Sequence, residues 1–423
     1  MRIAAVFGLT FVACLAPLSG PSWAGERVWL RAEQGQVELL TTAGPAEARE
    51  AMGEIEALQE ALARVAPRLL QNPGRLRIVA FTSDEEFAEF RVNAHSPAWF
   101  AGGPEWSAIV LGRLDEDSMP ALRHEFVHHL LRSSGCRLPL WLEEGLADAL
   151  SPLPKREAER RVRLLRGGAR LPWDILMAVR PGAQLYNDWE QARLFYAQSW
   201  ALAEALIHSS GGRLEPEILA EWAALGPEQE AVANALLRRF LKRPRPVGRQ
   251  WKLEARAAEA EVAPAPAGLV WTVLGRLSMQ LGRLESAAAH LRKAAWLWPE
   301  ALKLAGDLEY RRGRWLEARE AWRKAMALDV ADTRTLLRLA VLEQDLPGGE
   351  MTPVLERLLE KDPTQEEARL ALASQYIRRG QWLEARQRLS EVRSAPPRWA
   401  GFYQQALALV RMKTAGVDLL GTN

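Results

Sequence analysis

Residues 121–133 read ALRHEFVHHLLRS, and they place three of the chain's six histidines within six positions. His124 and His128 are four residues apart with Glu125 beside the first, which is the H-E-x-x-H pattern. The apolar spacing around them predicts a helix, with Pro120 in its first turn. On a helix, residues four apart share a face, so both imidazoles can reach one metal ion.

A second stretch, PLWLEEGLADAL at 139–150, predicts another helix and offers a third ligand. A catalytic zinc needs three protein ligands and one open position, and the two candidates here are Glu143 and Glu144. Asp148 lies four residues after Glu144 and shares its face, which places Asp148 to accept the other ring N–H of His124. The ligands expected for Zn²⁺ are therefore His124, His128 and Glu144. His129, rotated by about 100° from its neighbour, is expected on the surface or behind the ligands.

HEFVH at 124–128 followed by WLEEGLAD at 141–148 resembles the gluzincin metallopeptidases, and more closely the bacterial peptidase MA-like domains. The resemblance extends to a later Tyr-x-x-Ser, which here begins at Tyr196, and it covers roughly residues 28–255. It implies a zincin-like α+β fold and peptide-bond hydrolysis. It also implies Tyr196 as a donor to the oxyanion, for which packing within an aromatic helix is the alternative.

The expected reaction assigns Glu125 as the general base. Zinc polarises the scissile carbonyl, and Glu125 takes the proton from the attacking water and delivers it to the leaving amine. SAIVLG at 107–112 is the candidate edge strand for pairing with an extended peptide. The alternative is a periplasmic scaffold with a structural or vestigial zinc site. Glu125 favours the enzyme, because a structural site needs ligands but no general base.

The last third of the chain repeats. RRGRWLEAR at 311–319 returns as RRGQWLEAR at 378–386, which is 67 positions later. Half of this interval is close to the period of about 34 residues that is typical of tetratricopeptide repeats. About four helical pairs are therefore expected, and the concave face of such an array binds peptides or partner proteins.

Composition shifts divide the chain into four parts: a signal peptide at 1–24, an α+β core with both zinc helices at 25–152, a helical subdomain and linker at 153–262, and the repeats at 263–415. One helix is expected between the Pro-rich breaks at 243–248 and 263–268. Few contacts are expected to cross the second break, so the repeats should form a separable module.

The N-terminus is typical of a cleaved secretory signal, with Arg2, an apolar stretch and a small-residue site ending at Ala24. A bacterial protein of the periplasm or the exterior is expected, with a lipid anchor at Cys14 as the less favoured alternative. No later stretch is long enough to span a membrane. The 55 basic and 53 acidic residues give a net charge of +2, which does not indicate nucleic-acid binding.

Overall fold

The computed structural model describes residues 28–92, 96–103, 106–180, 189–212, 214–250, 253 and 255–415. The expected signal peptide, with Cys14 and Ala24, lies outside these residues. Within them, no helix combines the length and the apolar character needed to cross a membrane.

A six-stranded mixed sheet forms the first part of the molecule, and its strand order is β4-β5-β3-β2-β1-β6. The strands are β1 (Leu30–Gln34), β2 (Val37–Thr41), β3 (Leu76–Phe81), β4 (Ala98–Gly103), β5 (Trp106–Arg113) and β6 (Val262–Pro264). The three central strands β2, β3 and β5 run parallel, and the others pair antiparallel with their neighbours. The expected mixture of strands and helices is confirmed.

The prediction that SAIVLG forms an edge strand is wrong. This stretch lies in β5, which is paired on both sides, by β3 and by β4. The register of β4 with β5 runs from Ala98↔Leu111 to Gly103↔Trp106. The stretch AWFAGG at 98–103 ends in two glycines, which are common in turns, yet it folds back on β5 as a strand. Along this side of the described sheet, β4 is the edge.

The α-helix expected between the two Pro-rich breaks is also absent from the described residues there, 249–250, 253 and 255–262, in which the 3-10 turn Val247–Gln250 only ends. This segment instead runs against α1 (Pro45–Leu62), where Ala258 donates its N–H to the carbonyl of Arg49 at 2.9 Å. A Cβ on Gly53 would lie 1.7 Å from the carbonyl oxygen of Arg256, so only glycine permits this approach. The chain then pairs with β1 as β6, an edge position that tolerates Pro264.

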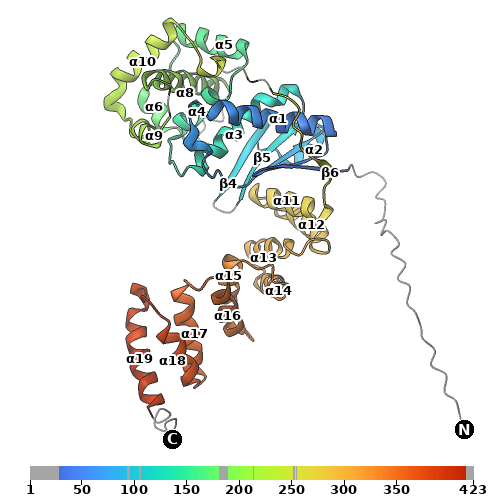
Figure 1. Cartoon of the computed structure of the whole chain (residues 1–423), viewed down its shortest axis with the longest axis vertical. Coiled ribbons are helices and arrows are strands. Elements are labelled where there is room, and N and C mark those ends of the chain that lie inside the picture. The colour runs from blue at the N-terminus through green and yellow to red at the C-terminus, as the bar shows by residue number, and fades with distance from the viewer. Residues whose placement is uncertain are drawn as a thin grey trace, which may run out of the picture.

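Helices cover both faces of the sheet (Figure 1). Alternate residues along a strand point to opposite faces. Leu39, Ile78 and Ile109 therefore pack with α1 and α3 (Met119–Ser133). Leu40, Val79 and Val110 pack instead with α11 (Ala267–Gln280), the first helix after the second Pro-rich break. The expectation that few contacts cross this break is therefore wrong.

A helical layer follows α3 and ends before β6. Its helices are α4 (Leu140–Leu150), α5 (Lys155–Arg166), α6 (Trp173–Ala178), α8 (Trp189–Ser209), α9 (Pro216–Ala223) and α10 (Glu230–Lys242); the short α2 (Asp84–Phe87) belongs to the sheet region. The backbones of α4 and α8 touch at Gly145, where an added Cβ would lie 2.4 Å from the carbonyl oxygen of Ser199. The close approach at Gly145 therefore fixes the position of α4 against α8.

The C-terminal part of the described chain consists of consecutive helix pairs and a last helix (Figure 1). After α11 they are α12 (Leu284–Ala295), α13 (Ala301–Arg311), α14 (Trp315–Ala327), α15 (Thr333–Asp345), α16 (Met351–Lys361), α17 (Glu366–Arg378), α18 (Trp382–Ser390) and α19 (Ala400–Thr414). Gly282, Gly313 and Gly380 turn the chain within three of the pairs with φ of +72°, +73° and +70°. Only glycine adopts this region readily, so these residues set the period of the pairs.

Candidate metal centre

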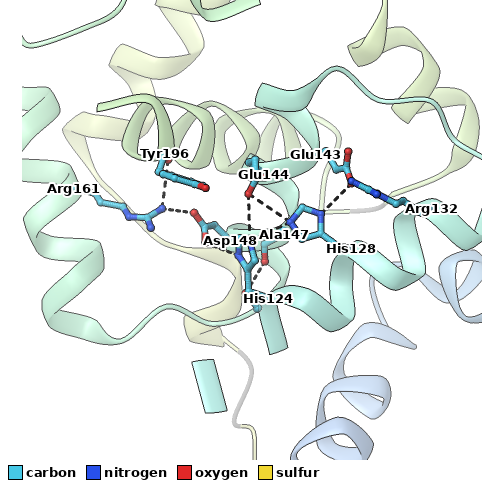
Figure 2. Close-up of polar contacts among 10 residues, drawn as sticks. His124, His128, Arg132, Glu143, Glu144, Ala147, Asp148, Arg161 and Tyr196 are labelled. Atoms are coloured by element: carbon cyan, nitrogen blue, oxygen red, sulfur yellow. Dashed lines mark hydrogen bonds and ion pairs between the residues drawn. The ribbon is translucent and has the colours of Figure 1, made fainter. Parts of the chain in front are cut away.

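Two adjacent helices build the candidate metal centre. His124 and His128 lie one turn apart on α3, and their rings face α4. Glu144 lies on α4, with its carboxylate directed back at the two imidazoles (Figure 2). The side chains of Glu144 and His128 are only 6% and 5% exposed, so they meet in the protein interior.

Three donor atoms converge on one point. The Nε2 atoms of His124 and His128 are 3.1 Å apart, and Oε2 of Glu144 lies 3.3 Å from the first and 3.4 Å from the second. These residues could hold a metal ion. Zinc–ligand bonds of about 2.0–2.1 Å in tetrahedral geometry place neighbouring ligand atoms about 3.3–3.4 Å apart. The observed spacing fits such a centre.

A carboxylate supports each imidazole from the far side of the ring. Nδ1 of His124 lies 2.9 Å from Oδ1 of Asp148, and Nδ1 of His128 lies 3.1 Å from Oε1 of Glu143. In the neutral form that binds a metal, each imidazole donates its Nδ1 hydrogen to a carboxylate, and its Nε2 lone pair is available to the ion. Such carboxylate–histidine pairs orient metal ligands and raise their basicity.

Two arginines complete this arrangement at its ends (Figure 2). Arg132 donates from Nε to Oε1 of Glu143 at 2.7 Å. Arg161, from α5, donates from Nη1 to Oδ2 of Asp148 and to the carbonyl of Tyr196, the second at 3.4 Å. Both supporting carboxylates are thus held by a guanidinium, and their charge is balanced.

The pKa values show that the centre attracts positive charge. Burial by itself disfavours the charged imidazole of His124, but Asp148 and Glu144 outweigh burial and hold its pKa well above the usual value. For His128, the carboxylates of Glu144 and Glu143 likewise overcome burial and raise the pKa to about 9. Burial favours the neutral acid of Glu144, yet the two imidazoles lower its pKa. Either protons or a metal cation can supply the positive charge that these three donors require.

Glu125 and Tyr196 both face the open side of the centre. They line a cleft of about 670 Å³ together with His124 and Asp148. Burial raises the pKa of the Glu125 carboxyl, which brings it closer to the range of a general acid or base. Tyr196 extends from α8 toward the cluster (Figure 2), and its ring also packs edge-on against Phe195 at 5.6 Å. Its position is compatible with either of the roles foreseen from the sequence.

The positions or roles of three residues of the site were not predicted from the sequence. Glu143 was weighed only as a rival ligand, whereas it holds His128. Arg161 carries no signal in the sequence, because it belongs to a basic helix whose packing alone brings it to Asp148. His129 is neither at the surface nor among the donors: it is 1% exposed and lies between Phe100 and Phe126, with ring centroids 6.1 Å from each.

No protein-family model matches the chain, and the search of curated proteins found none similar to it. The function is therefore inferred from the residues of the site and their geometry.

Proposed function

We propose that the protein is a zinc-dependent hydrolase of peptide bonds, of the gluzincin and peptidase MA-like type. One observation carries this proposal: three donor atoms lie 3.1–3.4 Å apart, and each histidine among them is backed by a carboxylate. His124, His128 and Glu144 would hold the ion. The donor set of two imidazoles and one carboxylate suits a catalytic zinc that keeps an open position.

The bound ion and the side chains of the protein would have separate roles in the reaction. A bound zinc ion supplies Lewis acidity, which polarises a carbonyl and acidifies water. Glu125 follows a ligand on the helix but is not one of the converging donors, so its carboxylate is available to take the proton from the attacking water. The same carboxyl then delivers the proton to the leaving amine. Tyr196, on the cleft wall, is placed to donate a hydrogen bond to the developing oxyanion.

The cleft supports an extended substrate. Ser96, Pro97 and Ala98, at the start of the edge strand β4, contribute to its lining. An extended peptide could therefore pair with β4, which takes the role that the sequence had assigned to SAIVLG. A catalytic domain of zincin-like fold is thus proposed, with the metal helices on one side of the cleft and the sheet edge on the other.

The helix pairs after residue 267 are proposed to be tetratricopeptide repeats that bind a partner protein. Their period and the glycine turns support this proposal. Export to the periplasm or the exterior is proposed from the N-terminal residues alone.

The test is Glu125→Gln. Glutamine keeps the size of the side chain but cannot accept the proton, so cleavage of a mixed peptide pool should fall by about 10² to 10⁴-fold while zinc stays bound. Glu116→Gln, an exposed residue just before α3, is the matched control and should behave as wild type. Zinc content and turnover are measured on the same samples.

Two outcomes would contradict the proposal. Comparable turnover in zinc-loaded wild type and Glu125→Gln would remove Glu125 as the base. Zinc binding without cleavage of any peptide by the wild type would instead favour a scaffold whose metal site is structural.

A further inference from the structure

A segment remote from the metal centre concentrates positive charge. Between Ala231 and Leu253 the chain has seven basic residues and no acidic one, whereas the rest of the chain has 48 basic and 53 acidic residues. The segment contains all of α10 except its first residue, Glu230, and the first Pro-rich break. A local excess of this size in a nearly neutral chain indicates an electrostatic role.

Four of these basic residues line a pocket of about 620 Å³ at the C-terminal end of α10. The pocket is lined by Arg239, Lys242, Arg243 and Arg245, by His208 and Ser209 from the last turn of α8, and by the apolar Ala205, Leu236 and Phe240. None of these described residues is acidic. The pocket therefore has a cationic rim over an apolar floor, and we call it the basic pocket.

The four cationic side chains of the basic pocket have no carboxylate partner. All four are exposed, and within the described part of the chain none forms an ion pair or a hydrogen bond through its side chain. By contrast, arginines that face a buried carboxylate are paired, as Arg161 is with Asp148 and Arg323 with Glu343. The charge of the basic pocket is thus left for a ligand from solution.

Cations at the end of a helix often serve only to stabilise its terminal carbonyls. Here another residue does so: Arg166 of α5 donates from Nε and Nη2 to the carbonyl of Leu241, at 2.9 and 2.6 Å, and more weakly to that of Lys242. The four cations of the basic pocket are not needed for this purpose.

We propose that the basic pocket binds a phosphate-bearing anion, presented as the headgroup of an anionic phospholipid or as free phosphate. Planar guanidinium groups match phosphate oxygens with two parallel hydrogen bonds. The exposed side of α10 continues from the pocket as Ala231, Val232 and Ala235, an apolar strip beside the cations that fits a lipid surface.

The basic pocket and the metal centre lie toward opposite ends of α8. Tyr196 faces the centre and His208 the pocket, and these two residues are separated by about 18 Å of helix. Figure 1 shows α8 and α10 on the side of the molecule away from the repeats. A bound anion would therefore leave the cleft open to substrate.

Binding is measured on the full mature chain with two probes: vesicles of phosphatidylglycerol against vesicles of phosphatidylcholine, by sedimentation, and inorganic phosphate, by calorimetry. The variant Arg239→Gln/Arg243→Gln should bind roughly tenfold or more weakly than wild type. The control Arg378→Gln/Arg411→Gln removes the same charge from exposed positions in the repeats and should match wild type.

Each outcome decides the proposal. Binding to phosphatidylglycerol alone, lost in the pocket variant, identifies a headgroup, and it should weaken with added salt because the charges are exposed. Saturable binding of inorganic phosphate that is lost in the same variant, without vesicle binding, identifies a free phosphate. Failure to bind either probe, or equal loss in variant and control, overturns the proposal.

Discussion

Two buried carboxylates, one in each half of the chain, have different kinds of partner. In the repeat half, Glu343 of α15 is 3% exposed and is held by both ends of the Arg323 guanidinium and by the N–H of Glu350 at 2.8 Å. In the first half, Glu144 faces the Nε2 atoms of two imidazoles instead of a fixed cation. An ion pair between fixed side chains stabilises the fold, whereas two imidazoles and a carboxylate around one point can also hold a cation from solution.

The halves also differ in which elements cover their hydrophobic cores. The later helix pairs pack on each other, and their core does not include the sheet. The first pair belongs to both halves, because α11 covers the second face of the sheet. The physical boundary between the halves therefore lies after the first helix pair and not at the Pro-rich break.

The largest expected effect tests that boundary. A chain that ends at Ala260 lacks β6 and exposes the sheet face covered by α11, and it should aggregate or lose its cooperative unfolding. The loss involves Leu269, Val270, Val273, Leu274 and Leu277. At about 1.5–3 kcal/mol for each buried side chain, this loss is on the order of 10 kcal/mol, as large as the stability of a typical domain.

The matched truncation ends at Glu300, just after the first helix pair, which keeps both faces of the sheet covered. It should melt cooperatively in a thermal scan and still bind zinc. A stable, zinc-binding protein that ends at Ala260 would show that the repeats are an independent module after all.

The next effect concerns Glu144 as a candidate metal ligand. Glu144→Ala removes a donor and should weaken zinc binding by more than about 100-fold, whereas Glu143→Ala removes only the partner of His128 and should weaken it by about 10 to 100-fold. Titration against a chelating dye measures both affinities, with Glu116→Ala as control. Equal losses in the two variants would contradict the assignment of Glu144 as the ligand.

A smaller effect tests how the metal helices are packed. Gly145→Ala places a methyl group against the Ser199 carbonyl and should lower the free energy of unfolding by about 1–3 kcal/mol. Gly401→Ala, near the start of α19, meets no atom within 4 Å and should be neutral or slightly stabilising. Denaturant unfolding midpoints compare the two. Similar destabilisation by both would mean that α4 and α8 do not pack as closely as described.

The smallest effect is a pH dependence in the sheet. Burial raises the pKa of Glu38, but Arg77 and Arg31 outweigh it, so the pKa of the folded state lies below the ordinary value of 4.5. The stabilisation by Glu38 is therefore present above that value and is lost as the pH falls through the lowered pKa. Glu38→Gln should be less stable than wild type by about 1 kcal/mol near neutral pH, and the difference should shrink in acid. If the stability difference between wild type and Glu38→Gln grew in acid, the pKa of Glu38 in the folded state would be raised and not lowered.

Much of the local structure follows from the sequence. The LRIVAF stretch is β3, the glycine-marked period predicts the helix pairs, and four-residue spacing brings His124 and His128 to one face of α3. These predictions succeed because turns, helix faces and buried strands depend on residues within a few positions of each other. The four-residue spacing that puts Glu144 and Asp148 on one face of α4 is a local feature of the same kind.

Only the tertiary structure decided which strands, helices and charged side chains are neighbours. It paired β4 with β5, added Val262–Pro264 to the sheet and placed α11 over its second face. It also brought Glu143 to His128 and Arg161 to Asp148. Such contacts join segments far apart in the chain, and their choice depends on which apolar faces remain uncovered and which buried charges still need a partner. The sequence by itself determined the two helices that carry the candidate ligands, while packing determined which charged side chains hold those residues in place.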